Sequence, residues 1–490
     1  MNQRLSITLF AFLLCTLNIA AQAITGKVAD QQQQPIEYAN IMIGDTYGVM
    51  SNTEGVFTVN TEGLAPTDKV IISCIGFESV QLPLSELKEG TYNLKEKINV
   101  LDEVFITNKK LSATEILTEV IKNAPKNYAQ KTVKETYFLR SSNSYKLLDS
   151  QFELLKSSLD SKATLKEINK EFAEMSKKTK GKTSKDFSEY YGFLYEQNSL
   201  KKLAVEKAIQ LKNNEKDVSG EQMSGKAIEL IKKYLDPGAT YKVRSGIIPI
   251  DDSLKINSPK KDVKTDIKTA SLRNSITALS SSLNKFYTNE ELDFFTEFKK
   301  YTYTLEGYTT MNDETIYIID FKPLKKSANY YGKIYVNAFD FGVAKLEYNL
   351  VEGKTESSVS LKFLLGVKMV EDRTKVSATY TKSEDGKYAL NFVKKESGTY
   401  AYMNRSLKFT KNKADKNEET KMIKLDFLGE FDNMNIKELF IIDRKPISDD
   451  EFKNVTENTT YNLNYISKYD PSVWKDYNVL APVEAIKNYN

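Results

Sequence analysis

The sequence predicts a multidomain, mainly β protein with some helix: an N-terminal β-sandwich followed by an α+β domain that contains a curved antiparallel sheet. The chain has 490 residues, a length typical of two or three domains. Near the N-terminus, short apolar segments recur every ~8–12 residues, which is typical of a sandwich. From Phe298 onward, alternating apolar and polar residues are interrupted by turn residues, which is typical of an antiparallel β-meander.

Residues 1–23 have the features of a secretory signal peptide. A short basic start precedes an apolar run over residues 5–21, and Ala21-Gln22-Ala23 fits a cleavage site. Polar residues interrupt the apolar run, which favours cleavage over a membrane anchor. Cys15 lacks the small preceding residue that lipidation requires. No later segment approaches the ~20 apolar residues of a membrane-spanning helix. We therefore expect an exported protein, either periplasmic or associated with the outer membrane.

Residues 24–107 are predicted to form the sandwich. Short apolar segments, each ended by Gly, Pro or Asn, alternate there with polar turns. Cys74 lies in one of these apolar segments, so we expect a buried structural thiol rather than a reactive one. Strands are expected over residues 24–28, 36–43, 56–59 and 69–75.

Glycine and apolar residues of this segment follow a fixed pattern: Gly26-x-Val28, Pro35-x-x-x-Ala39-Asn40-Ile41, Gly48-x-x-Ser51-Asn52-x-x-Gly55-x-Phe57, Ser73-x-x-Gly76-Phe77 and Leu101-Asp-Glu-Val104-x-Ile106. The set resembles the carboxypeptidase-regulatory-like domain, with Glu54 in place of the usual Asp. The resemblance implies a seven-stranded, transthyretin-like sandwich that carries no catalytic residue. It leaves open whether the loops bind a partner or the domain is a folded spacer.

Residues 108–297 are predicted to mix helices and strands. A first helix begins with the capping box Ser112-Ala-Thr-Glu115 and is expected to end at Pro125. The lysine-rich residues 177–185 are expected to form a solvated loop, with contact to anionic lipid or polysaccharide as the alternative. Further helices are expected over residues 165–175 and 227–235, and a long polar loop near residues 253–282.

Residues 298–445 are predicted to form the antiparallel β-meander, and residues 446–490 a C-terminal tail segment. Turns are expected at residues 311–314, 339–342, 371–372 and 385–386, and a charged loop at 411–421. The phrases Asp320-Phe-Lys-Pro323, Gly332-Lys-Ile-Tyr335 and Tyr469-Asp-Pro471-x-x-Trp474-Lys-x-Tyr477-Asn478 resemble those of a group of envelope proteins common in Bacteroidota. That group has no assigned activity, so the resemblance implies none.

The sequence contains no histidine. Without imidazole, Ser-His-Asp and Cys-His catalysis and histidine-ligated zinc sites are excluded. Phosphate-binding and dinucleotide-binding glycine motifs are missing too, so no cofactor and no metal site is predicted. Signal removal leaves Cys74 as a single cysteine, which cannot form a CxxC pair. The 70 basic and 66 acidic side chains nearly cancel, which does not indicate a nucleic-acid partner.

These exclusions favour a non-catalytic envelope protein that acts in binding or assembly, with an envelope protein, a lipid or a glycan as partner. The candidate binding surface is a set of sheet tyrosines, for which ordinary sheet packing is the alternative: Tyr301, Tyr303, Tyr308, Tyr330 and Tyr335. One alternative function is a carboxylate-dependent hydrolase of an envelope polymer, which needs two facing carboxyl groups ~5–10 Å apart, one with a raised pKa. Another is a purely structural accessory protein of the outer membrane.

Overall fold

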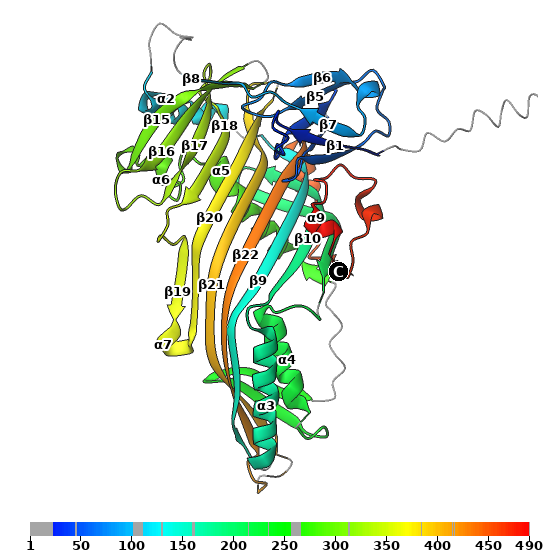
Figure 1. Ribbon diagram of the computed structural model, residues 1–490, viewed down its shortest axis with the longest axis vertical. Coiled ribbons are helices and arrows are strands. Elements are labelled where there is room, and N and C mark those ends of the chain that lie inside the picture. Colours follow the sequence, from blue (N-terminus) through cyan, green and yellow to red (C-terminus); the bar gives the residue numbers. More distant parts are fainter. Residues whose placement is uncertain are drawn as a thin grey trace, which may run out of the picture. The chain divides into compact units, whose positions relative to one another are not determined.

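The computed structural model describes residues 23–44, 47–100, 111–128, 131–158, 162–213, 215–233, 235–255, 266–311, 314–383, 385–413, 415 and 417–489 (Figure 1). The chain divides into two compact units. The first, called the sandwich unit, contains the residues up to Asn99 together with Tyr308–Thr315 and Asp470–Asn488. The second, called the sheet unit, contains Val100–Gly307, Ile316–Tyr469 and Tyr489–Asn490. Residues 1–22 of the predicted signal peptide and the Leu101–Ile106 motif lie outside the described residues.

The sandwich has a three-stranded sheet, in the order β4-β1-β7, and a four-stranded sheet, in the order β3-β2-β5-β6. The predicted seven-stranded sandwich is thereby confirmed. Cys74 directly follows β5 and is half-buried against the sandwich core, less buried than expected. The elements are β1 (Ala23–Ala29), β2 (Asn40–Ile43), β3 (Tyr47–Met50), β4 (Val56–Asn60), β5 (Lys69–Ser73), β6 (Val80–Pro83), η1 (Leu84–Glu86) and β7 (Gly90–Asn93); β8 (Ile98–Val100) follows.

Two glycines of the sequence pattern are required by the sandwich core. A Cβ atom on Gly26 would lie 2.4 Å from the ring of Phe57, which is fully buried. Gly55 has a φ of +75°, and a Cβ atom there would lie 2.3 Å from the carbonyl oxygen of Val28. Gly55 therefore combines a left-handed backbone with a close backbone approach, which only glycine tolerates.

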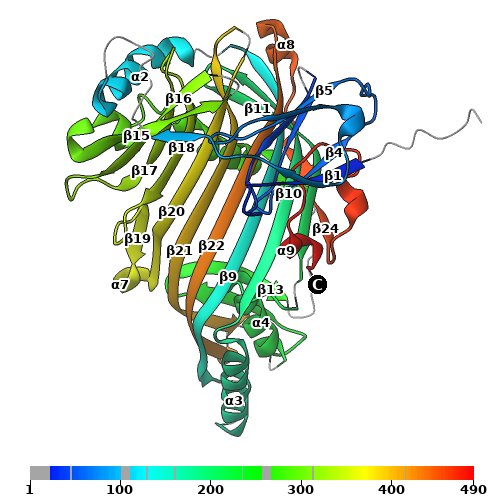
Figure 2. The same ribbon diagram turned by 45° about the horizontal axis from the view of Figure 1, so that its top comes forward.

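One large sheet dominates the sheet unit, with the strand order β24-β11-β10-β9-β22-β21-β20-β18-β17-β16-β15. Figure 2 shows three very long strands, β9, β21 and β22, side by side in its centre. The strands are β9 (Val133–Ser157), β10 (Thr183–Gln197), β11 (Leu200–Lys212), β15 (Tyr301–Met311), β16 (Glu314–Pro323), β17 (Tyr330–Asn337), β18 (Val343–Leu350), β20 (Val367–Lys382), β21 (Tyr388–Lys411), β22 (Met422–Pro446) and β24 (Asn464–Ile466).

The sheet joins two regions that the sequence analysis separated. β9 comes from the predicted mixed region 108–297 and pairs along its whole length with β22 from the predicted meander 298–445. The expected boundary at residue 297 is therefore wrong as a structural division. The boundary was misplaced because strands that are far apart in the sequence pair without leaving a local signal.

Helices cover one face of the large sheet at two places. An upper cluster of buried apolar residues packs α2 (Ala113–Asn127), α5 (Thr269–Asn284) and α6 (Asp293–Thr296) against the sheet. A lower cluster packs α3 (Lys162–Thr179) and α4 (Gly220–Lys232) against the other end of the long strands (Figure 1). Leu139 of β9 belongs to the upper cluster and Leu147 to the lower one, so both clusters lie on the same face.

The expected polar loop near residues 253–282 is largely wrong. β13 (Ile248–Lys255) and β14 (Asp266–Lys268) occupy part of it, and α5 begins at Thr269. Leu272, Ile276 and Leu279 are buried at helical spacing, a pattern that the many serines around them obscured. Residues 256–265 lie outside the described residues. The lysine-rich residues 177–185 are not a plain loop either, since they span the end of α3, a turn at Gly181 and the start of β10.

Two other predictions, the end of the first helix and the turn at residues 371–372, are corrected. The capping box at Ser112 is confirmed, but α2 continues through Pro125 to Asn127. The proline removes only the one hydrogen bond that its own nitrogen would donate, and the amide of Tyr128 still donates to Ala124 at 2.9 Å, so the last turn stays helical. The expected turn at residues 371–372 is an irregularity within β20. The chain instead reverses at α7 (Lys362–Leu365) and Gly366, between β19 (Ser357–Leu361) and β20.

The C-terminal tail segment is shared between the units. α8 (Asp449–Asn454), β23 (Thr460–Asn462) and β24 belong to the sheet unit, whereas η3 (Pro471–Trp474) and α9 (Glu484–Lys487) belong to the sandwich unit. Among the described helices, none is both long and apolar enough to span a bilayer.

Candidate functional site

Three of the five predicted tyrosines belong to the upper cluster. Tyr301 and Tyr330 keep only 4% and 6% of their surface exposed, and Tyr303 packs against the same cluster. The ring of Phe294 lies 6.3 Å from that of Tyr301 and 5.9 Å from that of Tyr330. The Tyr303 hydroxyl donates to the carbonyl oxygen of Phe294 at 2.6 Å. Burial and the neighbouring carboxylate of Asp293 raise the pKa of Tyr301. These are properties of a packed core, so these side chains do not offer an open surface.

The other two tyrosines lie elsewhere. Tyr335 stands an odd number of residues from Tyr330 in β17, so its side chain points to the opposite face of the sheet. Its hydroxyl bonds to Glu347 at 3.2 Å. Tyr308 belongs to the sandwich unit. The expectation that the five tyrosines form one surface is thus corrected, because alternation along a strand separated some of them and helices covered others.

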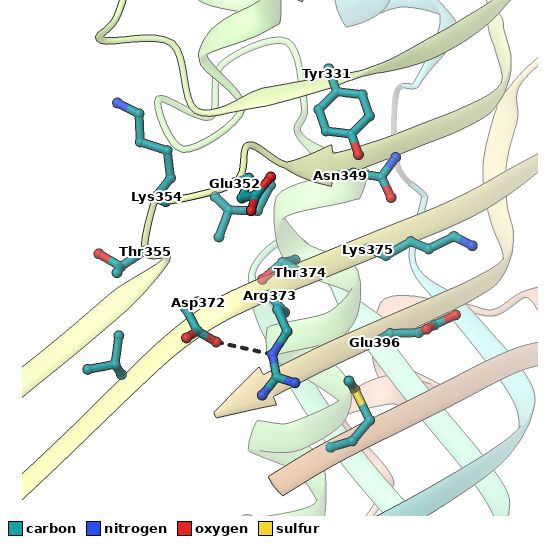
Figure 3. Close-up of a pocket in the computed structure, with 14 residues that line it drawn as sticks. Tyr331, Asn349, Glu352, Lys354, Thr355, Asp372, Arg373, Thr374, Lys375 and Glu396 are labelled. Atoms are coloured by element: carbon teal, nitrogen blue, oxygen red, sulfur yellow. Dashed lines mark hydrogen bonds and ion pairs between the residues drawn. The ribbon is translucent and has the colours of Figure 1, made fainter. Parts of the chain in front are cut away.

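An open groove lies instead on the sheet face opposite the helices. Its volume is about 650 Å³, and it is lined by β17, β18, β20, β21, β22 and the loop after β18 (Figure 3). Tyr331 pairs across strands with Asn349, Asn349 with Lys375, and Lys375 with Glu396. Because directly paired residues share a face, these four side chains form one row along the groove.

The middle of the groove is organised by Arg373. Its guanidinium group is paired with Asp372 at 3.2 Å and also with Asp432. It lies over Gly398, where a Cβ atom would come within 2.3 Å of the Arg373 Nε atom. The missing side chain at Gly398 therefore makes room for the arginine, which Figure 3 shows pointing across the strands.

Several polar side chains of the groove have no internal partner. Within the described part of the chain they make no hydrogen bond and no ion pair: Tyr331, Asn349, Glu352, Thr355 and Lys375. The groove also has an apolar component, from Leu350, Val370 and Met434. Unpaired donors and acceptors beside apolar surface are the ordinary features of a ligand site.

The helix-covered face carries a band of polar residues between the two clusters. It consists of three cross-strand rows, here called the polar band: Lys395-Lys437-Ser141-Ser188, Ser397-Asn435-Asn143-Asp186 and Thr399-Asn433-Tyr145-Ser184. The row above it is Val393-Leu439-Leu139 of the upper cluster, and the row below is Ala401-Phe431-Leu147 at the lower cluster. The polarity thus changes abruptly along the same strands.

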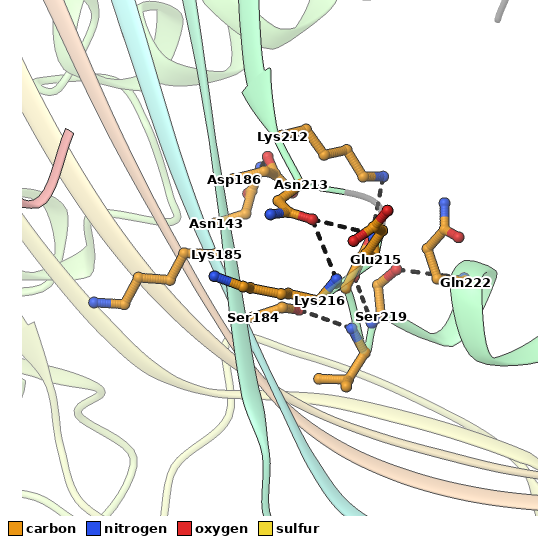
Figure 4. Close-up of polar contacts among 12 residues, drawn as sticks. Asn143, Ser184, Lys185, Asp186, Lys212, Asn213, Glu215, Lys216, Ser219 and Gln222 are labelled. Carbon is orange, nitrogen blue, oxygen red and sulfur yellow. Dashed lines mark hydrogen bonds and ion pairs between the residues drawn. The ribbon is translucent and has the colours of Figure 1, made fainter. Parts of the chain in front are cut away.

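One end of the polar band continues into a buried network around Asp217 (Figure 4). Ser184 donates its hydroxyl to Asp217 at 3.1 Å, the amide of Ser219 donates to the same carboxylate at 2.7 Å, and Lys212 forms an ion pair with it at 3.1 Å. Burial alone would raise the pKa of Asp217, but the Ser219 amide and Lys212 hold the pKa below its usual range. The network fixes the connection between β11 and α4 to β10.

Asp186, in the same region, behaves in the opposite way. Burial raises the pKa of its carboxyl group, although the Asn143 amide donates to it at 2.8 Å and Lys212 lies nearby. Two aspartates with opposite shifts can indicate acid–base chemistry. Neither residue, however, lines the groove or the smaller cavity described next.

A smaller cavity of about 360 Å³ contains the carboxyl pair that best fits the hydrolase alternative. Glu135 and Glu196 both line it. Burial raises the pKa of Glu196, although Lys201 forms an ion pair with it at 3.0 Å. Glu135 is paired with Arg444. A third carboxylate, that of Asp385, lines the same cavity and is paired with Lys131. Each of the three therefore already has a cationic partner. Among the described residues, no group of three or more Cys, Asp or Glu side chains could hold a metal ion.

In the sandwich unit, residues of the sequence pattern bind the chain's own tail. Asn52 is fully buried, and its side-chain amide donates to the carbonyl oxygens of Ala481 and Pro482 at 3.2 and 3.3 Å. Glu54 accepts from the backbone amide of Glu484 at 3.0 Å. This turn of the sandwich therefore holds residues 481–484 in place, a role that no local sequence signal indicated.

Comparisons with known proteins bear on the two units differently. Residues 24–106 match the family model of the CarboxypepD_reg-like domain. No curated protein matches the chain. A solved LolA superfamily protein from Nitrosomonas europaea is 10% identical, with a TM-score of 0.19, over 70% of this chain and 98% of that one. A solved protein of unknown function from Bacteroides fragilis is 9% identical, with a TM-score of 0.12, over 85% and 98%. Both TM-scores are too low to establish a common fold. The N-terminal segment, residues 24–106, is a CarboxypepD_reg-like domain.

Proposed function

We propose that this protein is an exported, non-catalytic binding protein of the cell envelope, and that the groove on the open face of the large sheet holds its ligand. The observation that supports the proposal is the set of five polar side chains without internal partners around an apolar base. The signal-peptide features of residues 1–23 support export. The lack of histidine removes the commonest general base and favours recognition over turnover.

The mixed chemistry of the groove supports a polar ligand with an exposed apolar or ring face. Tyr331 is 43% exposed, so its ring and hydroxyl group are available together. Asn349 and Thr355 add neutral hydrogen-bonding groups, and Lys375 and Glu352 add one charge of each sign. A glycan or a lipid headgroup fits this combination better than an extended apolar chain.

The groove is tested with the double variant Tyr331→Ala, Lys375→Ala and the matched control Tyr465→Ala. Tyr465 is 37% exposed and lies on β24, at the opposite end of the strand order. Glycan and lipid fractions of a bacterial envelope are passed over immobilised protein, and the retained material is identified by mass spectrometry. We expect the double variant to retain at least ~10-fold less of a component that wild type and control both retain, equivalent to about 1.4 kcal/mol. Equal retention by all three proteins, or retention by none, contradicts the proposal.

A carboxylate-dependent hydrolase is the second candidate, supported by the presence of Glu135 and Glu196 in one cavity and the raised pKa of Glu196. It predicts turnover of a purified envelope polymer that Glu196→Gln abolishes and that Glu352→Gln, in the groove, leaves unchanged. If wild-type protein releases no product, this candidate fails while the binding proposal stands. A purely structural accessory role would instead give a co-purifying membrane protein and no small ligand.

A further inference from the structure

β19 is an edge strand of the large sheet. It pairs with the N-terminal part of β20, Val367–Glu371. Within the part of the chain that the structure describes, no other strand pairs with it, and the backbone of residues 357–361 makes no hydrogen bond to any other segment. All five residues are exposed, and Figures 1 and 2 show β19 and α7 at the free edge of the sheet. The outward N–H and C=O groups of β19 are therefore available to a further strand.

The β19–β20 hairpin is held in place at both ends. At the turn, Arg405 donates to the carbonyl oxygen of Leu365 at 2.9 Å. At the other end, the amide of Glu356 donates to the carbonyl oxygen of Glu371 at 2.8 Å. These bonds fix the backbone of β19, which lowers the conformational entropy that is lost when a further strand pairs with it.

A different edge strand of the sheet unit, β13, is protected against such pairing. Among the described strands, β13 pairs only with β12 (Thr240–Ser245). It contains Pro249, which has no N–H group to donate, and the charged residues Asp251 and Asp252. Its pairing with β12 also shifts register twice. Proline, charge and irregular pairing are the usual features that keep a sheet edge from associating.

β19 has none of these protective features. Its sequence, Ser357-Ser-Val-Ser-Leu361, contains no charged residue and no proline, and its pairing with β20 is regular. A neutral, regular and exposed edge strand is a template for the addition of another strand. We therefore looked for the strand that best fits beside it.

The two faces of β19 differ in polarity. Val359 pairs with Met369, and Met369 pairs with Ala401 at the lower cluster, so the Val359 side chain points to the helix-covered face. Val359 and Met369 are 56% and 51% exposed, and Leu361, two residues along the strand, is 40% exposed on the same face. The serines on either side of Val359 point to the opposite face. A matching strand therefore needs apolar side chains at alternate positions and small polar side chains between them.

β19 of a second copy meets this requirement. In an antiparallel pair about a two-fold axis through Val359, the opposed residues are Val359 with Val359, Ser358 with Ser360, and Ser357 with Leu361. Opposed residues share a face, so the apolar side chains of the two copies meet on the helix-covered face and the serines of each middle pair meet on the other. No like charges oppose each other. Self-pairing of β13 about its middle would instead oppose aspartates.

We propose that β19 pairs antiparallel with β19 of a second copy about a two-fold axis through Val359, which joins the two large sheets into one. Backbone hydrogen bonds provide the affinity, and the alternate side chains provide the specificity. Five residues from each copy form a small contact beside the standard interface of about 1,600 Å², so we expect a reversible dimer with a dissociation constant of roughly 1–100 µM. The pairing needs no ligand in the groove, so it adds to the proposed function and does not depend on it.

The test is sedimentation equilibrium of the mature chain at concentrations from ~1 to ~500 µM, which bracket the expected dissociation constant. The variants are Val359→Lys and Val359→Glu, each measured alone and in an equal mixture. The matched control is Leu324→Lys, whose wild-type side chain is 66% exposed elsewhere on the sheet unit. Unchanged thermal unfolding of each variant shows that folding is retained.

We expect wild type and control to dimerise, and each Val359 variant alone to dimerise at least ~10-fold more weakly, because the two-fold axis places like charges opposite each other. The equal mixture should dimerise again, since the introduced charges are then opposite in sign. The proposal is overturned if wild type stays monomeric at every concentration, or if Val359→Lys leaves the dimer intact. A mixture that stays monomeric overturns it as well, because Val359 then does not lie opposite its own copy.

Discussion

The sandwich and the large sheet bury their strands in different ways. The sandwich has strands of four to seven residues, and two facing sheets share one continuous apolar core. The large sheet contains β9, β21 and β22, with 24 or 25 residues each, and its helices form two separate clusters on one face. Between the clusters the same strands carry the polar band. A single long strand can therefore carry apolar side chains in the sections that helices cover and polar side chains in the section between them.

The largest expected effect tests whether the two clusters are independent. Phe172 of α3 is fully buried in the lower cluster, 5.6 Å from the ring of Phe152. Phe172→Ala should destabilise this end by about 3–5 kcal/mol, the usual cost of removing a buried phenylalanine side chain. Hydrogen exchange should speed up in α3 and α4 while β16, β17 and β18 stay protected. Phe339→Ala, at a site 64% exposed, is the control. Equal loss of protection in both clusters would contradict their independence.

An intermediate effect is expected in the sandwich. Gly55→Ala combines a left-handed backbone with a Cβ atom 2.3 Å from the carbonyl oxygen of Val28, and should cost about 3 kcal/mol or more. The only tryptophan in the sequence, Trp474, belongs to the sandwich unit, so its fluorescence during urea unfolding reports on this unit. Gly63→Ala is the matched control: its φ is +76°, but no atom lies within 4 Å of the added Cβ, so we expect only about 1 kcal/mol. Equal losses would show that the close approach does not matter.

The smallest expected effect on stability is in the polar band, where the substitution should stabilise the protein and not destabilise it. The pKa of Asp186 is raised by burial, so its contribution to stability is full below the ordinary pKa of aspartate and is lost as the pH rises through the folded-state value. Asp186→Asn should therefore raise the thermal midpoint at pH 7 and have little effect below about pH 4.

Asp217→Asn is the control, because the pKa shift of Asp217 is opposite to that of Asp186 and its effect on the thermal midpoint should be opposite too. The pKa of Asp217 is lowered, so its ionised form stabilises the fold above the ordinary aspartate pKa, and that stability is lost as the pH falls through the folded-state value. The variant should lower the midpoint at pH 7 and approach wild type in acid. If both variants shift the thermal midpoint in the same direction at pH 7, the opposite pKa shifts assigned to Asp186 and Asp217 are wrong.

Local patterns in the sequence predicted local structure well. The sandwich strands, the capping box at Ser112 and the hairpin at Gly386 were all found because their signals lie within a few neighbouring residues. The helix α5 was missed because its serines outnumber its buried leucines. The groove was missed because Tyr331, Lys375 and Glu396 are brought into one row by strand register alone. The buried Tyr301 was mistaken for a surface residue because alternation does not tell which face is covered.

The sequence by itself determined the sandwich strands, the start of α2, the lack of imidazole chemistry and the family of residues 24–106, because residue identity and short-range spacing suffice for each. The tertiary structure decided how β9 joins β22, which strand sections lie under helices, and how the tail residues 481–484 reach Asn52. These features depend on contacts between residues up to hundreds of positions apart. Such contacts form when the chain closes long loops, and no local pattern encodes them.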